Sequence, residues 1–162
     1  MNAMRDQLLH WLGRTPVQTF VLSPLAVIGF ELARQDGGIT FVPFFVAAGL
    51  PLIAWGYLQY RLVGRYRLRQ GGGGPGMAAP PQRIVAQGPY RYTRNPMYLG
   101  HLIFTLGLAL TFWSWFALVL FALRAAWFQK RVWGDEARLA ATFGDEYKAY
   151  RARVKRWVPG LF

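Results

Sequence analysis

The sequence contains no cysteine, and only seven of its 162 residues are acidic. The missing thiols exclude disulfides and every metal or nucleophilic site that is built on cysteine. Charged residues make up 16% of the chain and hydrophobic residues 54%, whereas water-soluble domains carry roughly a quarter of charged residues. No internal repeat is present, so we expect one domain over residues 1–162.

Long runs of the sequence also contain no charged residue, although the formal net charge is +12. Residues 95–123 hold no Asp, Glu, Lys or Arg. A nucleic-acid-binding protein would spread its cations along exposed faces, whereas here basic blocks alternate with apolar runs, as in a membrane protein. We therefore predict no nucleic-acid partner and no metal ion. The first apolar run has no clear small-residue cleavage site, so a cleavable signal peptide is not expected.

Four apolar stretches come close to or reach the roughly 20 residues that cross a bilayer. They cover about 15–33, 39–60, 97–112 and 114–130. Pro43 and Pro51 predict a kinked second helix, and two tryptophans flank a tight turn at Ser114. The predicted fold class is all-α: an integral membrane bundle of four transmembrane helices, followed by a C-terminal cytosolic amphipathic helix over about 135–157.

The cations predict the orientation. Seven arginines and no acid lie between Arg61 and Arg94, and eight cations accompany four acids from Gln129 onward. The two opposite connections hold only Arg34 and Asp36. Both termini are therefore predicted in the cytosol, and the cytoplasmic membrane is the expected location. The glycine-rich stretch 70–81 is expected to be a flexible linker.

A first motif, Gly88-Pro-Tyr-Arg-Tyr-Thr-Arg-Asn-Pro-Met-Tyr-Leu-Gly100, directly precedes the third apolar stretch. We expect Pro96 in the first turn of a helix and Asn95 at its N-cap, so that free backbone N–H groups could receive a carboxylate. The alternative is an interfacial belt formed by Tyr90, Tyr92 and Tyr98.

A second motif contains two acids followed by an aromatic stripe. Asp135 and Glu136 precede Phe143-Gly-Asp-Glu-Tyr147-Lys-Ala-Tyr150. The spacing of Leu139, Phe143, Tyr147, Tyr150 and Val154 predicts one helix face that lies on the membrane or closes over the bundle. Gly144 is expected to break this helix. The simpler explanation of the acid pair is favourable negative charge at a helix start.

Polar residues inside the apolar stretches are further candidates. His101 and Thr105 follow Tyr98 at helical spacing on one face, and ionisable groups inside a bilayer are often functional. A hydrogen bond between helices, to Thr111 or Ser114, is the alternative. Arg124 could bind an anionic acceptor, or its side chain could extend to the headgroups.

The two motifs together resemble the isoprenylcysteine carboxyl methyltransferase and phospholipid methyltransferase family of integral membrane enzymes. That family has an Arg-His-Pro-x-Tyr-x-Gly box, a helical hairpin, a Glu-Glu pair and a Phe-Gly-x-x-Tyr-x-x-Tyr stretch. The corresponding segments here are Arg94-Asn-Pro-Met-Tyr-Leu-Gly100, Asp135-Glu136 and Phe143 to Tyr150. Asn95 replaces the histidine and Asp135 replaces the first glutamate, and the resemblance covers residues 88–159.

The resemblance implies S-adenosylmethionine as cofactor and a lipid or other lipophilic acceptor. The residues expected to bind the cofactor are Tyr90, Asn95, Pro96, Tyr98, Leu99 and Glu136. Tyr98 or His101 is expected to assist proton removal, and Arg94 and Arg124 to bind the substrate. Two other functions stay open: a non-catalytic lipid-binding membrane protein, and an NADPH-dependent membrane reductase of similar fold. The sequence predicts neither the acceptor nor the oligomeric state.

Overall fold

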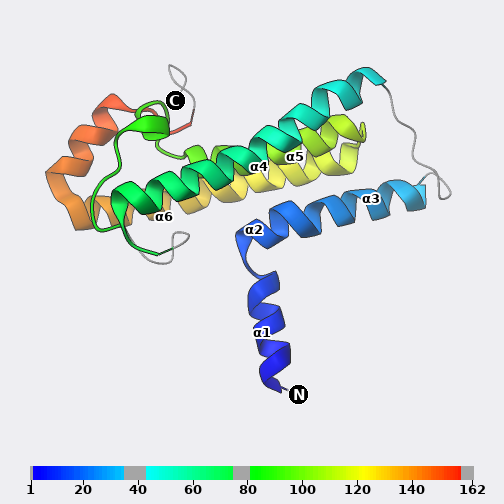
Figure 1. The fold of residues 1–162 in the computed structure, drawn as a ribbon, viewed down its shortest axis with the longest axis horizontal. Coiled ribbons are helices and arrows are strands. Elements are labelled where there is room, and N and C mark those ends of the chain that lie inside the picture. The colour runs from blue at the N-terminus through cyan, green and yellow to red at the C-terminus, as the bar shows by residue number, and fades with distance from the viewer. Residues whose placement is uncertain (1, 35–42, 75–80, 158–162) are drawn as a thin grey trace. The chain divides into compact units, whose positions relative to one another are not determined.

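A computed structural model describes residues 2–34, 43–74 and 81–157, and the regular elements of this part of the chain are helices, without strands (Figure 1). Its elements are α1 (Asn2–Leu12), α2 (Thr15–Val17), the π-helical turn η1 (Gln18–Leu22), α3 (Ser23–Arg34), α4 (Pro43–Gly71), the 3-10 turn η2 (Gly88–Arg91), α5 (Pro96–Thr111) and α6 (Trp115–Arg153). The predicted all-α class is confirmed.

One described helix is long and apolar enough to cross a membrane. It runs from Thr15 to Arg34 through α2, η1 and α3, with 20 residues and a mean hydropathy of 1.4. Helix α5 is apolar but shorter. The first predicted span therefore has the length and composition required, whereas the bundle of four spans stays a prediction.

One helix boundary differs from the sequence prediction, and another adjoins residues outside the described part. Helix α4 is described from Pro43 to Gly71, with Pro51 inside it. Residues 39–42 lie outside the described part. Helix α6 continues through 130–135, because this stretch contains no proline and its one glycine is tolerated. The helix breaks only at Gly144, where φ is 51°, a value that favours glycine.

The predicted turn at Ser114 is confirmed. Helix α5 ends at Thr111 and α6 begins at Trp115. Between them Trp113 has a positive φ of 47°, and Ser114 Oγ accepts a hydrogen bond from the Ala117 N–H at 3.2 Å. Ser114 thus caps the first turn of α6 with its side chain.

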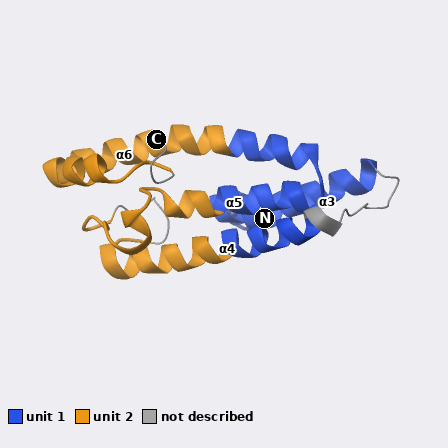
Figure 2. Ribbon diagram, turned by 90° about the horizontal axis from the view of Figure 1, so that it is seen from above, with its two compact units in different colours: residues 1–57, 101–124 blue, residues 58–100, 125–162 orange. Residues whose placement is uncertain are grey.

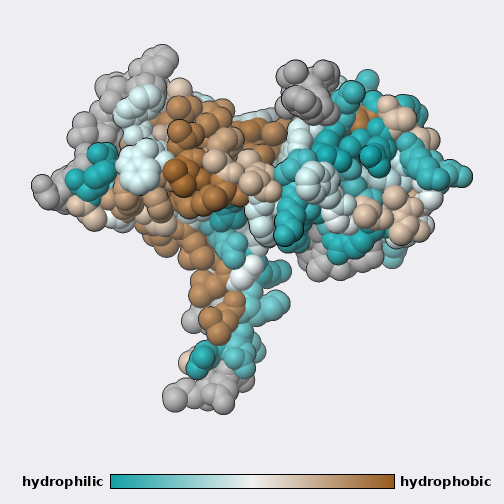
Figure 3. All heavy atoms as spheres, turned by 180° about the vertical axis from the view of Figure 1, so that it is seen from behind, coloured by the Kyte–Doolittle hydropathy of each residue, from teal (hydrophilic) through white to brown (hydrophobic). Residues whose placement is uncertain are grey.

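The chain divides into two compact units, coloured separately in Figure 2. Unit 1 comprises residues 1–57 and 101–124. Its core consists of the buried side chains Val27, Phe104, Leu108, Ala109 and Ala117. Most of the exposed large hydrophobic side chains of the molecule also belong to this unit, and apolar residues cover much of its visible surface in Figure 3. An apolar environment suits such a surface better than water.

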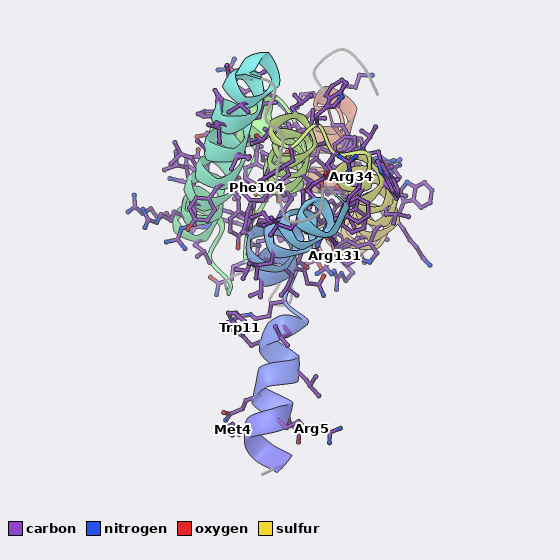
Figure 4. All side chains as sticks on the ribbon, turned by 90° about the vertical axis from the view of Figure 1, so that its right-hand side faces the viewer. Met4, Arg5, Trp11, Arg34, Phe104 and Arg131 are labelled. Atoms are coloured by element: carbon purple, nitrogen blue, oxygen red, sulfur yellow. The ribbon has the colours of Figure 1, made fainter. Side chains whose placement is uncertain are left out.

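Within unit 1, α1 has an apolar side and a hydrophilic side (Figure 3). Met4, Arg5 and Trp11 project from this helix (Figure 4), and the exposed fractions of Met4 and Trp11 are 75% and 45%. This pattern is typical of helices that lie at an interface.

Unit 2 comprises residues 58–100 and 125–162. Its core is the predicted aromatic stripe: Tyr147, Tyr150 and Val154 are buried, and Leu139 and Phe143 pack against them. The stripe faces the segment that contains Ile84 and Ala86. The expectation that it lies on the membrane is therefore wrong, because the segment that contains Ile84 and Ala86 covers it.

Candidate active site

Unit 2 brings the two sequence motifs together through a buried carboxylate. Glu136, on α6, accepts hydrogen bonds from Arg94, which directly precedes the N-cap of α5, and from Arg156, which follows α6. Arg94 Nη2 lies 2.9 Å from Glu136 Oε1, and Arg156 Nη2 lies 2.9 Å from Glu136 Oε2. The side chains of Glu136 and Arg94 are 8% and 9% exposed. Both carboxylate oxygens are thus satisfied by guanidinium groups.

Backbone contacts hold the same two segments together. The Arg94 N–H donates to the Lys155 carbonyl at 3.0 Å, and the Asn95 side-chain amide donates to the Arg156 carbonyl at 3.1 Å. Thr93 Oγ1 donates to that same carbonyl at 2.9 Å. We call these contacts between 93–95 and 151–156 the strap. Asn95 occupies the predicted N-cap position, since its carbonyl accepts from the Leu99 N–H, but its side chain belongs to the strap.

Tyr98 is held by a second polar cluster of unit 2. Its hydroxyl donates to Asp135 Oδ2 at 2.7 Å and accepts from Arg131 Nε at 2.9 Å, and Arg138 pairs with the other oxygen of Asp135. Both acids therefore lie in the middle of α6 and not at a helix start, which overturns the simpler explanation of the acid pair. The hydroxyl proton of Tyr98 is directed at a carboxylate, so proton transfer from Tyr98 would end on Asp135.

A cavity of about 580 Å³ in unit 2 is bordered by Arg94 and Arg156, the two partners of Glu136. The residues that line it are Arg94, Gln129, Arg151, Lys155, Arg156 and Trp157. Trp157 is held in place because its indole N–H donates to Gln129 Oε1 at 2.7 Å. Ligand pockets have volumes of about 300–1,000 Å³. Four cationic side chains and an indole thus border a space that is large enough for a nucleoside-sized ligand.

Charge and burial set the protonation of this site. Burial alone would raise the pKa of the Glu136 carboxyl, but the hydrogen bonds from Arg156 and the charge of Arg94 hold it below the ordinary value of 4.5. Burial, with the negative charge of Glu136 as a smaller cause, raises the pKa of Tyr147 to about 12. Glu136 is therefore anionic and Tyr147 neutral at physiological pH.

The depressed pKa of Glu136 predicts acid sensitivity. Because the carboxyl binds its proton more weakly in the folded state, its contribution to stability is complete above about pH 4.5 and is lost as pH falls through the folded-state pKa. We expect the melting temperature of the wild type to exceed that of Glu136→Gln at neutral pH, and the difference to shrink below about pH 4.5. A difference independent of pH would contradict this assignment.

The other predicted residues divide between the units. In unit 2, Pro96 is buried and its carbonyl accepts from Gln59 Nε2 at 2.9 Å, and Leu99 is half-buried. The Tyr90 carbonyl accepts from the Tyr150 hydroxyl at 2.8 Å. Tyr92 is 57% exposed, whereas Tyr98 is 8% exposed, so the three tyrosines do not form one interfacial belt.

His101 and Arg124 belong to unit 1. His101 is 3% exposed and stacks on Phe20, with ring centroids 4.7 Å apart. The Thr105 hydroxyl donates to the His101 carbonyl within α5. Arg124 donates to Ser23 Oγ at 3.3 Å. The Thr105 hydroxyl therefore makes its hydrogen bond within its own helix, and the imidazole of His101 packs against the ring of Phe20.

Sequence reasoning missed several residues at this site. Arg151, Lys155, Arg156 and Trp157 line the cavity but were interpreted only as a basic end of the chain. One available signal was the concentration of four cations within residues 151–156, directly after the buried stripe. Asp135, named only as part of the acid pair, is the partner of Tyr98.

The described part of the chain is helical, and one of its two units exposes many apolar side chains. The other unit contains a cavity lined by cations, and two of these cations pair with a buried glutamate. Residues 44–145 match the phospholipid methyltransferase family, and the chain belongs to this family. It is also similar to a protein-S-isoprenylcysteine O-methyltransferase from Schizosaccharomyces pombe, with 36% identity over 78 residues. That match covers 47% of this chain and 33% of the relative, so this chain matches about a third of the relative's length.

Proposed function

We propose that this chain is an S-adenosylmethionine-dependent methyltransferase that acts on a lipid-phase acceptor at the cytosolic membrane face. The cavity is the observation that carries the proposal, because Arg94 of the first motif and Arg156 both line it and both pair with Glu136 of the second motif. Family membership supports methyl transfer, and the relative's name supports a lipophilic acceptor.

The chemistry of the cavity lining fits this cofactor. S-adenosylmethionine carries a carboxylate, an ammonium group, an adenine ring and the sulfonium whose methyl group is electrophilic. Lys155 and Arg151 would bind the carboxylate, and the negative charge of Glu136, behind the lining side chains of Arg94 and Arg156, would attract the ammonium group. Trp157 offers a face on which adenine can stack. Asn95 would act on the cavity through the strap, whereas Tyr90, Pro96 and Leu99 are not among the residues that line it in the described part of the chain.

Methyl transfer of this kind depends mainly on positioning and on the exclusion of water. The strap holds the segment 93–95 in place, and the buried stripe forms part of the packed interior of unit 2. An amine acceptor must first lose a proton, and Tyr98 can relay it to Asp135 through their hydrogen bond. His101 is the second candidate for this role. A carboxylate or thiolate acceptor would need neither.

The proposed topology places both termini and the cavity in the cytosol. Arg151, Lys155 and Arg156 belong to the basic segments that favour the cytosolic side. A cofactor from the cytosol can then reach unit 2, while the acceptor enters from the bilayer.

Thermal unfolding of the purified chain in detergent tests cofactor binding. S-adenosylhomocysteine at about 100 times its dissociation constant should stabilise the fold by about 2.7 kcal/mol, and NADPH should not displace it. A shift with NADPH alone would support the reductase, and no shift with either ligand would support a non-catalytic protein.

Transfer itself can be followed in membranes that contain the chain and methyl-labelled cofactor. Label in N-methylated phospholipids identifies an amine acceptor, and base-labile label identifies a carboxyl ester. Glu136→Gln should lose the label, whereas Glu146→Gln, which changes an exposed acid of the same helix, should keep it. Equal labelling in membranes with the wild type, with Glu136→Gln, with Glu146→Gln and with no added chain would overturn the proposal.

A further inference from the structure

Helix α1 packs little against the rest of the described chain. Of its side chains that the structure describes, all except Leu12 are exposed, and the described core of unit 1 contains none of its residues. The helix has 11 residues, and isolated helices shorter than about 12–15 residues are marginally stable in water. A surface outside the described part of the chain is therefore needed to stabilise α1.

The two faces of α1 differ in polarity. Met4 and Trp11 are seven residues apart, which is nearly two helical turns, so they share one face. Their side chains are 75% and 45% exposed. Asp6 and His10, four residues apart, share the opposite side and are also exposed. Because large apolar side chains are unfavourable in water, the face with Met4 and Trp11 fits an apolar surface.

A short turn joins α1 to the helix Thr15–Arg34. The Gly13 N–H donates to the Leu9 carbonyl at 2.9 Å, and the backbone of Arg14 is extended, with a ψ of 128°. The Gln18 side-chain amide donates back to the Gly13 carbonyl at 3.4 Å. Beyond this turn α1 runs across the direction of α3 in both Figure 1 and Figure 4, and both helices belong to unit 1.

The apolar face of α1 is turned in the direction in which α3 runs. Figure 3 shows hydrophobic residues on the side of α1 toward the apolar body of unit 1, and hydrophilic residues on the other side. The helix Thr15–Arg34 has the length and hydropathy to cross a membrane. If it crosses, a helix that runs across its N-terminal end, with the apolar face toward the bilayer, lies along the membrane surface.

The charges near α1 suit phospholipid headgroups. Arg5 and Arg14 are exposed, and Asp6 is the one acid of residues 1–14. Every phospholipid headgroup carries a phosphate, which a guanidinium binds with two parallel hydrogen bonds. The indole of Trp11 is a group that concentrates at the boundary between hydrocarbon and water. Charge and aromatic content thus favour a lipid surface over a protein as the partner.

We propose that α1 is a surface anchor, which binds the bilayer surface at the N-terminal end of the first span. Met4 and Trp11 enter the boundary of the acyl chains, and Arg5 and Arg14 contact phospholipid phosphates. This inference goes beyond the proposed function: it uses the proposed span and does not depend on methyl transfer. The anchor would hold the N-terminal end of the span at one depth in the membrane.

Spin labels on single cysteines test the anchor, and the chain has no cysteine of its own to interfere. The full chain is placed in phosphatidylcholine vesicles, and each label is exposed to dissolved oxygen, which concentrates in hydrocarbon, and to a water-soluble nickel chelate. We expect the label of Met4→Cys to lie about 5–10 Å below the headgroups and to favour oxygen. The label of Asp6→Cys should favour the nickel chelate.

A label on α3 separates failure of the anchor from failure of the span. Leu25 is 61% exposed, so the label of Leu25→Cys should favour oxygen. Oxygen access at Leu25 with nickel access at Met4 would refute the anchor and leave the span intact. Nickel access at both positions would overturn the span and the anchor together. Broadening of the Met4 signal that vanishes on dilution with unlabelled chain would assign this face to a second copy and also overturn the proposal.

Variants test the assignment of the two faces. In the chain labelled at Met4→Cys, Trp11→Asp should shift access from oxygen toward the nickel chelate, because a carboxylate on the apolar face opposes its entry into the bilayer. His10→Asp places the same charge on the opposite side and should leave access unchanged. Equal access in the two variants would contradict the anchor.

The cofactor readout is independent of this result. Trp11→Asp should keep the thermal shift with S-adenosylhomocysteine, because α1 contributes no residue to the cavity in the described part of unit 2. If the wild type shows no such shift and the labels behave as expected, the proposed function fails and the anchor stands.

Discussion

Glu136→Ala is expected to lower the free energy of unfolding by about 3–5 kcal/mol and to abolish stabilisation by S-adenosylhomocysteine. The substitution leaves Arg94 and Arg156 without the carboxylate that both of them contact. Removing one partner of a buried ion pair has a cost of this size, because the remaining charge stays desolvated. Thermal and denaturant unfolding in detergent, with and without the ligand, measure both effects.

Two further variants show whether the effect is specific. Glu146→Ala removes an exposed acid from the same helix and should change stability by less than about 0.5 kcal/mol. Glu136→Gln keeps the shape of the side chain and part of its hydrogen bonding, so it should fold better than the alanine variant and still bind the ligand poorly. Normal ligand binding by Glu136→Gln would show that the carboxylate does not hold the cofactor.

Gly107→Ala is expected to destabilise unit 1 by about 3 kcal/mol, near the upper end of the range for overpacked cores. A Cβ atom at Gly107 would lie 2.7 Å from the backbone nitrogen of Ile53 and 2.9 Å from the carbonyl oxygen of Gly49. Backbone atoms cannot relieve the clash by changing rotamer, as a flexible side chain can. Helices α4 and α5 would therefore have to move apart. Gly49→Ala should have a similar effect, because its Cβ would meet Thr111 and the Gly107 carbonyl.

Gly29→Ala is the matched control for this close approach. A Cβ atom at Gly29, inside α3, would have nothing within 4 Å among the described residues. Alanine is the better helix former by about 1 kcal/mol, so this variant should be neutral or slightly more stable. Melting temperatures of Gly107→Ala, Gly49→Ala and Gly29→Ala test this expectation. Equal behaviour of Gly107→Ala and Gly29→Ala would contradict the contact between α4 and α5.

Local signals in the sequence predicted much of the fold. The all-α class follows from long apolar runs with few strand signals, and the turn at Ser114 follows from the polar interruption between two tryptophans. The break at Gly144 follows from the freedom of glycine at positive φ. The continuation of α6 through 130–135 was missed, because a change from apolar to charged residues ends a predicted span but does not end a helix.

The site was predictable where a motif specified it. Arg94 and Glu136 were both named, but the sequence assigned them to different ligands, whereas they form one ion pair. Periodicity predicted which face of the last helix is apolar but could not predict what covers it, because Ile84 and Ala86 approach it only through the tertiary fold. The same limit applies to Arg67, interpreted as a topology signal, which is buried and donates to the Gly74 carbonyl at 2.7 Å.

The strap joins two segments whose residues Arg94, Lys155 and Arg156 also line the cavity. The amide of Arg94 and the side chains of Thr93 and Asn95 share two neighbouring carbonyls, those of Lys155 and Arg156. Once one of these bonds breaks, the others lose their alignment, so the segment 93–95 would detach in a single cooperative step instead of fraying. A bound cofactor that bridges both segments would suppress this step. If the proposed cofactor binds in this cavity, its residence time would then depend on the lifetime of the closed strap.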